Sequence, residues 1–147
     1  MKAKDIMSTD IVYVSSNTSI HEASKLMKEH NIGFLPIIDN DYIYGVLTDR
    51  DIVIRVLSNN TIFCTVKECA TTSPLYMVKE DTDIRDVINL MSDKQIRRVL
   101  VLNNNGDFTG IISLKDIILS SNIEDKLKGI FIDCNNPIVY VNTDLKI

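Results

Sequence analysis

The chain alternates between short apolar runs and stretches in which apolar residues recur at helical spacing. Residues 11–14 form a β-branched and aromatic run, which predicts a strand. Ser19 and Glu22 have the spacing of a capping box, and the apolar positions that follow recur every three or four residues, which predicts a helix. Residues 34–38 lack polar alternation and predict a strand buried on both faces. After a turn of Asp and Asn residues, residues 42–47 predict a third strand.

The same order occurs a second time further along the chain. Residues 4–57 align with residues 67–122, with small shifts of register where loops are expected. Tyr13 aligns with Tyr76 at the first strand, and the third strand recurs over residues 107–112. A second helix follows the third strand in each copy. We therefore predict an α+β (mixed α/β) fold built from two β-α-β-β-α repeats.

The repeats divide the chain into three parts. We predict a first repeat over residues 1–60, a second repeat over residues 61–121 and a C-terminal tail over residues 122–147. The tail begins with a mixed helical pattern and ends in a strand-like segment over residues 137–141, which is expected to cover a sheet edge or to join a dimer interface.

Composition narrows the class of function. Among the 147 residues, 45% are hydrophobic and 24% are charged, which is ordinary for a globular fold. The net charge of −4 argues against a dedicated nucleic-acid binder, because such proteins usually carry a basic face. No run of about eighteen apolar residues is present, so we expect no membrane-spanning segment.

The reactive side chains indicate neither catalysis nor a metal site. Cys64, Cys69 and Cys134 form no CxxC pair, and an odd number of cysteines suits a reducing compartment, so we predict a cytoplasmic protein. His21 and His30 have no metal-ligand spacing and are predicted to lie on the surface of a helix. No nucleophile–base motif is present, so we predict that the protein is not an enzyme and holds no catalytic cofactor.

One motif occurs at the end of the third strand in both copies. It has the form Gly-φ-φ-Ser/Thr-x-basic-Asp, where φ is apolar, and spans residues 45–51 and 110–116. The hydroxyl, the cation and the carboxylate are Thr48, Arg50 and Asp51 in the first copy and Ser113, Lys115 and Asp116 in the second.

Two interpretations of this motif compete. A hydroxyl followed three residues later by a carboxylate is close to a plain capping box, which is a structural feature of a helix start. The same groups also suit a nucleotide, because a helix N-terminus favours phosphate and an ionised carboxylate accepts hydrogen bonds from the two ribose hydroxyls. The recurrence of the motif at matching positions favours a binding site.

The repeated layout resembles the cystathionine-β-synthase (CBS) domain family. The resemblance rests on the opening residues 4–8, on residues 33–39, on the motif at residues 45–51 and on the tandem arrangement, and it covers roughly residues 3–121. It implies that two repeats pack through their sheets with pseudo-twofold symmetry. It also implies two clefts between the repeats, which in this family commonly bind AMP, ADP, ATP, S-adenosylmethionine or related ligands.

The resemblance also assigns roles to residues. Asp51 would bind the ribose in one cleft with Thr48 near the ribose or phosphate, and Ser113 and Asp116 would do the same in the other. The adenine edge would be recognised by the backbone at Ile11 and Val12 and at Leu75 and Tyr76. Basic residues before the second strand would face the phosphates; these are Arg97 and Arg98 in the second copy, where the first copy has Gly33 and Phe34.

We therefore expect two unequal sites, and the spacing leaves open which ribose site the two arginines complete. The leading hypothesis is a regulatory module that binds AMP, ADP or ATP, forms a homodimer and signals to a separate, unidentified protein. The alternatives are a ligand-free dimerisation module and a sensor of S-adenosylmethionine or NADH.

Overall fold

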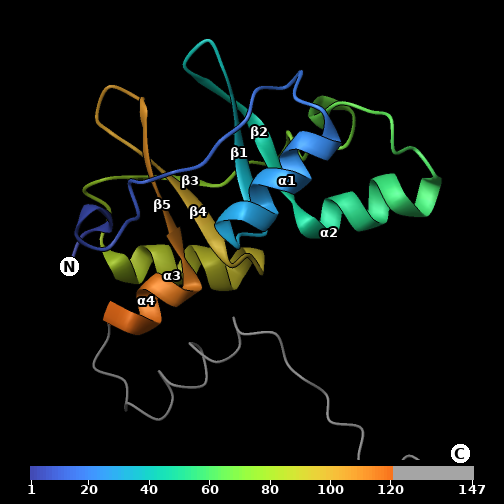
Figure 1. Cartoon of the computed structure of the whole chain (residues 1–147). Coiled ribbons are helices and arrows are strands. Elements are labelled where there is room, and N and C mark those ends of the chain that lie inside the picture. Colours follow the sequence, from blue (N-terminus) through green and yellow to red (C-terminus); the bar gives the residue numbers. More distant parts are fainter. Residues whose placement is uncertain (121–147) are drawn as a thin grey trace, which may run out of the picture.

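The computed structural model describes residues 1–120, and its elements follow the repeated order that the sequence predicts (Figure 1). The first repeat contains α1 (Ile20–His30), β1 (Phe34–Asp39), β2 (Tyr42–Thr48) and α2 (Asp49–Asp51), which continues as a π-helical turn η2 (Ile52–Val56) and a 3₁₀ turn η3 (Leu57–Asn59). The second contains β3 (Met77–Lys79), α3 (Ile84–Lys94), β4 (Arg98–Leu102), β5 (Phe108–Ser113) and α4 (Leu114–Ser120). Short 3₁₀ helices, η1 (Ala3–Asp5) and η4 (Val66–Glu68), precede the two repeats. The predicted tail lies outside the described residues.

The first long helix of each repeat is set by its two ends. The predicted capping box of α1 is confirmed: Ser19 Oγ accepts from the Glu22 N–H at 3.2 Å, and Glu22 Oε2 accepts from the Ser19 N–H at 3.3 Å. In α3 the side chain of Asp83 takes the capping role. Both helices stop after 11 residues at a left-handed residue, Asn31 with φ 51° and Gln95 with φ 53°.

The sheet of the first repeat has two strands and that of the second has three. The prediction of a strand over residues 11–14 is therefore wrong. In the second repeat β3 lies parallel to β4, whereas the first repeat has only a single bridge between Val14 and Ile37. The Leu100 N–H donates to the Tyr76 carbonyl at 3.2 Å, but the matching position in the first repeat is Pro36, which has no N–H. The next ladder bond is lost as well, because the Ser16 N–H donates to Asp39 Oδ1 at 3.0 Å.

The same bonds correct the alignment of the repeats. The Val14 N–H donates to the Pro36 carbonyl at 3.1 Å, and the Ile38 N–H donates to the Val14 carbonyl at 2.8 Å. This pattern makes Val12 the counterpart of Tyr76, so the alignment of Tyr13 with Tyr76 is one residue out of register. The one-residue gap in the alignment of the repeats therefore lies before this segment, not between this segment and α1.

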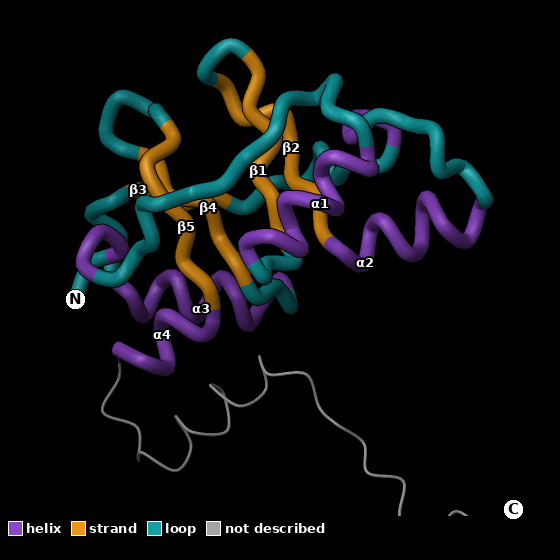
Figure 2. The backbone as a smooth tube through the Cα atoms, in the orientation of Figure 1, coloured by secondary structure: helices purple, strands orange, loops and turns teal. Residues whose placement is uncertain are grey.

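Each repeat is completed by the segment that precedes the other one. The core of the first repeat includes Cys64, Val66 and Cys69, and the Val66 N–H donates to the Thr18 carbonyl at 2.8 Å. The core of the second repeat includes Ala3, whose N–H donates to the Thr82 carbonyl at 2.9 Å. Figure 2 shows the loop after η1 running from the second repeat across to α1. The exchanged segments tie the two repeats together with pseudo-twofold symmetry.

Three smaller observations concern the cysteines, the histidines and the length of the helices. Cys64 and Cys69 are free and buried, and burial raises the pKa of the Cys69 thiol to about 11, so it is protonated at neutral pH. His21 and His30 are exposed, as predicted. Within residues 1–120 no helix has the length and apolar character needed to cross a membrane.

Candidate functional site: a cleft between the repeats

Both copies of the repeated motif form capping boxes. Thr48 donates from its N–H and its hydroxyl to Asp51 Oδ2 at 2.9 and 2.7 Å, and its hydroxyl oxygen accepts from the Asp51 N–H at 3.1 Å. Ser113 and Asp116 repeat this arrangement at 2.7, 2.6 and 3.3 Å. The structural interpretation of the motif is therefore confirmed. It uses only one carboxylate oxygen, so it leaves room for a second role.

The second oxygen of Asp51 is oriented by a residue that the sequence analysis missed. Arg55 Nη2 lies 3.4 Å from Asp51 Oδ1, and Arg55 Nη1 donates to the Cys69 carbonyl at 2.9 Å. The Asp51 side chain is only 13% exposed, so this ion pair is partly shielded from water. The matching residue in the second repeat is Ser120, which cannot form such a pair. The two carboxylates of the motif therefore differ in their surroundings.

Asp51 and Thr48 open into a cleft of about 390 Å³ between the repeats, which we call the first cleft. The opposite wall comes from the second repeat and contains Leu75, Tyr76, Arg97 and Arg98 together with Pro74 and Ile96. Six of the predicted site residues thus lie around one cavity. The two arginines line this cleft beside Thr48 and Asp51, and they also line a second space that contains Ser113 and Lys115.

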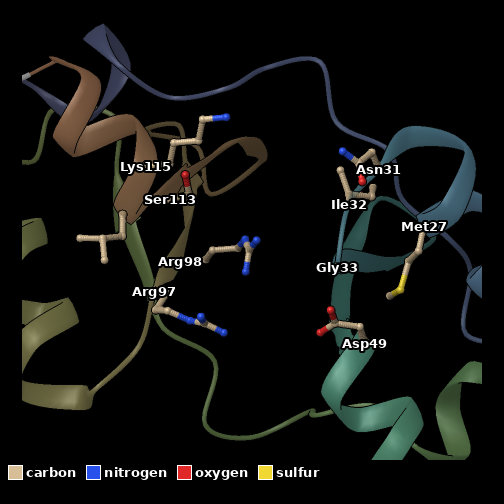
Figure 3. Close-up of a pocket in the computed structure, with 10 residues that line it drawn as sticks. Met27, Asn31, Ile32, Gly33, Asp49, Arg97, Arg98, Ser113 and Lys115 are labelled. Carbon is tan, nitrogen blue, oxygen red and sulfur yellow. The ribbon is translucent and has the colours of Figure 1, made fainter. Parts of the chain in front are cut away.

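A larger cavity of about 690 Å³ adjoins the first cleft, and we call it the central cavity. Arg97 and Arg98 line both spaces, so the two lie next to each other. Figure 3 shows Arg97, Arg98, Ser113 and Lys115 on one wall. Asp49, Gly33, Ile32, Asn31 and Met27 lie on the other wall. The cavity therefore lies between groups of opposite charge that belong to different repeats.

Arg98 lies where the two repeats meet. The guanidinium carbon of Arg98 is 5.3 Å from the centre of the Phe34 ring. Phe34 occupies the position in the first repeat that Arg98 occupies in the second. Burial lowers the pKa of Arg98, and the neighbouring charge of Arg97 lowers it further, whereas Asp49 and Asp116 act in the opposite direction. Arg98 stays protonated at neutral pH, since an arginine pKa is far above 7. Two like charges in a partly buried place favour binding of an anion.

The residues predicted for the second site are divided between different places. Ile11 lines a cavity of about 520 Å³ between the two hairpin turns, while Val12 packs against the core of the first repeat. Ser113 and Lys115 line the central cavity. Asp116 lines neither the first cleft nor the central cavity, and the same holds for the exposed Arg50. The residues predicted for the second site therefore do not line one cavity together, unlike those predicted for the first.

Sequence reasoning also missed Asp49, the acidic residue of the central cavity. Asp49 occupies the variable position of the motif, where the second copy has Leu114. The signal that could have identified Asp49 was this difference between the two aligned copies of the motif. No group of three potential metal ligands occurs within residues 1–120.

Comparison with known proteins establishes the family. The CBS domain family matches residues 3–58 and 66–122, so the chain belongs to the CBS domain family. Hypoxic response protein 1 of Mycobacterium tuberculosis is 38% identical over 120 residues, which are 78% of this chain and 81% of that protein. The resemblance inferred from the repeated motifs is confirmed.

Two solved structures show the same architecture with adenosine ligands. The CBS domain pair of protein MJ0100, in complex with 5′-methylthioadenosine and S-adenosyl-L-methionine, superposes with a TM-score of 0.72 and 32% identity, over 81% of this chain and 94% of that chain. CBSX2 in complex with AMP superposes with a TM-score of 0.70 and 26% identity, over 81% of this chain and 94% of that chain. The predicted mixed α/β fold of paired CBS repeats is confirmed.

Proposed function

We propose that this protein is a non-catalytic regulatory module that binds an adenine nucleotide, AMP, ADP or ATP, in the first cleft. The observation that carries the proposal is the convergence of an acid, two cations and apolar side chains from different repeats on one space of about 390 Å³. That volume falls in the usual range for small-molecule sites. The adenosine ligands of the MJ0100 pair and of CBSX2 support the same class of ligand.

Each part of a nucleotide has a matching group in the first cleft. Asp51 keeps Oδ1 outside its capping box, and an ionised carboxylate can accept from both ribose hydroxyls. Leu75 and Tyr76 offer backbone groups for the adenine edge and apolar surface for its face. Arg97 and Arg98 provide the positive charge for the phosphates, and a guanidinium binds two phosphate oxygens at once.

The regulatory part of the proposal follows from the shared walls of the cleft. A ligand that contacts Thr48 and Asp51 from one repeat and Arg97 from the other stabilises one relative placement of the repeats. Only such a difference in affinity between conformations can transmit a signal. We propose that the signal reaches a separate protein in the cytoplasm, where the buried thiols of Cys64 and Cys69 remain reduced.

We further propose that the module is a homodimer. Apolar side chains are exposed along residues 53–63, and this set, the 53–63 patch, comprises Val53 (56%), Ile54 (47%), Leu57 (53%), Ile62 (53%) and Phe63 (98%). Several exposed apolar side chains in one short segment indicate an interaction site. A second copy presents the same apolar surface, and a twofold contact would cover both.

The test is a thermal-shift panel of AMP, ADP, ATP, S-adenosylmethionine, 5′-methylthioadenosine and NADH. A ligand present at about a hundredfold above its Kd stabilises the native state by about 2.7 kcal/mol. The proposal expects an adenine nucleotide to give the largest shift. A larger shift with S-adenosylmethionine or NADH would change the ligand class, and no shift with any compound would support the ligand-free alternative.

Two matched variants then assign the binding to the first cleft. Asp51→Ala and Asp116→Ala each remove the capping carboxylate of one repeat, and Asp51→Ala also removes the partner of Arg55, so the folding cost of each variant is measured first by thermal melting. Titration calorimetry below the melting temperature of both variants should show binding at least about tenfold weaker for Asp51→Ala than for Asp116→Ala. Equal effects of the two substitutions would contradict the assignment.

A further inference from the structure

The two walls of the central cavity carry opposite charges. Arg97, Arg98 and Lys115 line it from the second repeat, and Asp49 is the acidic residue on the wall of the first repeat. In Figure 3 the carboxylate of Asp49 points into the cavity, towards the side chain of Arg97 on the opposite wall. A ligand that reaches from the first cleft into this space would contact the two arginines, which line both, and would approach Asp49.

Local structure holds the Asp49 carboxylate in this position. The Asp49 N–H donates to the Gly33 carbonyl at 3.2 Å, as the Leu114 N–H donates to the Arg97 carbonyl at 2.9 Å, so Asp49 and Leu114 are structural counterparts. Asp49 Oδ1 accepts from the Arg50 N–H at 2.8 Å. A Cβ added to Gly33 would lie 2.5 Å from Asp49 Oδ2. The carboxylate thus occupies space that the missing side chain of Gly33 leaves open.

We propose that Asp49 is a selectivity residue that disfavours nucleotides with longer phosphate chains relative to a nucleoside monophosphate. This inference rests on the proposed function of the first cleft. A nucleotide held by Asp51 brings its first phosphate to Arg97 and Arg98, which line both spaces. Each further phosphate extends into the central cavity and adds negative charge close to the Asp49 carboxylate. Lys115 acts in the opposite sense, because its ammonium attracts the same phosphates.

The experiment compares AMP and ATP binding by titration calorimetry, without divalent cations, for the wild type and for Asp49→Asn. The asparagine keeps the size and the acceptor oxygen of the side chain and removes only the charge. The ratio of the ATP Kd to the AMP Kd should fall about five- to tenfold, because like charges a few ångströms apart repel even where solvent screens them.

The matched control is Asp41→Asn, which makes the same charge change at the other end of β2. Asp41 has a left-handed backbone with φ 67°, which asparagine tolerates. Seven strand residues at about 3.3 Å each place it roughly 20 Å away, beyond the screening length of about 8 Å at physiological salt. The ratio of the two Kd values should therefore stay at the wild-type value in this variant.

A second variant tests the opposite wall. Lys115→Gln should raise the ratio of the ATP Kd to the AMP Kd, whereas Asp49→Asn lowers it. If both nucleotides bind the wild type and neither substitution changes the ratio, the role of Asp49 is refuted while the proposed function stands. If neither nucleotide binds the wild type, the proposed function fails and the selectivity role fails with it.

Discussion

Gly45→Ala is predicted to destabilise the protein because the backbone of the second repeat's leading segment crosses β2 at this residue. A Cβ on Gly45 would lie 2.7 Å from the carbonyl oxygen of Thr71, a backbone atom that cannot rotate away. Thr71 exchanges two hydrogen bonds with Val46, each 2.9 Å long, and Gly45 is itself buried. The substitution must therefore push the crossing segment away from the strand.

The magnitude follows from the contacts that move. Overpacking of this kind costs about 1–3 kcal/mol, and weakening the two Val46–Thr71 hydrogen bonds costs about 1 kcal/mol each at most. Replacing glycine restricts the unfolded chain and returns about 0.4–1 kcal/mol. A net loss of about 2 kcal/mol is expected. For a chain of 147 residues this lowers the Tm by about 4–8 °C.

Gly110→Ala is the matched control, since Gly110 occupies the same position in the second repeat. There an added Cβ would meet the Met7 side chain, with Sδ at 2.6 Å, Cγ at 2.9 Å and Cβ at 3.1 Å, and no backbone atom is among these nearest three, so a change of the Met7 rotamer relieves most of the overlap. We expect a loss of less than about 1 kcal/mol for this variant. Calorimetric melting and urea denaturation of both variants measure the difference. Equal stability of the two variants, or a Gly45→Ala protein as stable as the wild type, would refute the reasoning.

Two further predictions concern pH and assembly. Hydrogen bonds from Thr65, first from its backbone N–H and second from its hydroxyl, lower the pKa of Glu68 from its ordinary value near 4.5. The stability that the ionised Glu68 contributes is therefore complete above about pH 4.5 and is lost as the pH falls through the lower native pKa. Melting temperatures should decline below about pH 4.5, and Glu68→Gln should flatten that decline; an unchanged profile would contradict the assignment. Phe63→Asp should convert the proposed dimer to a monomer in sedimentation equilibrium, whereas Tyr42→Asp, at the 79% exposed first residue of β2, should not. Equal masses for both variants would exclude the 53–63 patch as the interface.

The elements whose signals come from residues close together in the sequence could be predicted from the sequence. The cap at Ser19, the buried strand at residues 34–38 and the helix starts at Thr48 and Ser113 are all present. Their signals lie within a few residues of each other, because caps and apolar runs act over one helical turn or one strand. The prediction of a strand at residues 11–14 was wrong because that strand depends on a residue far away in the sequence. Its existence depends on an N–H from position 36, which is more than twenty residues away and is a proline.

The same distinction holds for the site. The sequence by itself determined the repeat and the family, and it supplied the carboxylates and arginines that we propose bind a nucleotide, because each is a residue type in a local motif. Only the tertiary structure decided which of them share a cavity: Arg97 and Arg98 line the first cleft with Asp51 and also line the central cavity, whereas Asp116 and Val12 line neither. The exchange of the leading segments, the pairing of Asp51 with Arg55 and the position of Asp49 opposite Arg97 were also decided there. These contacts join residues far apart in the chain, and only packing between elements brings them together.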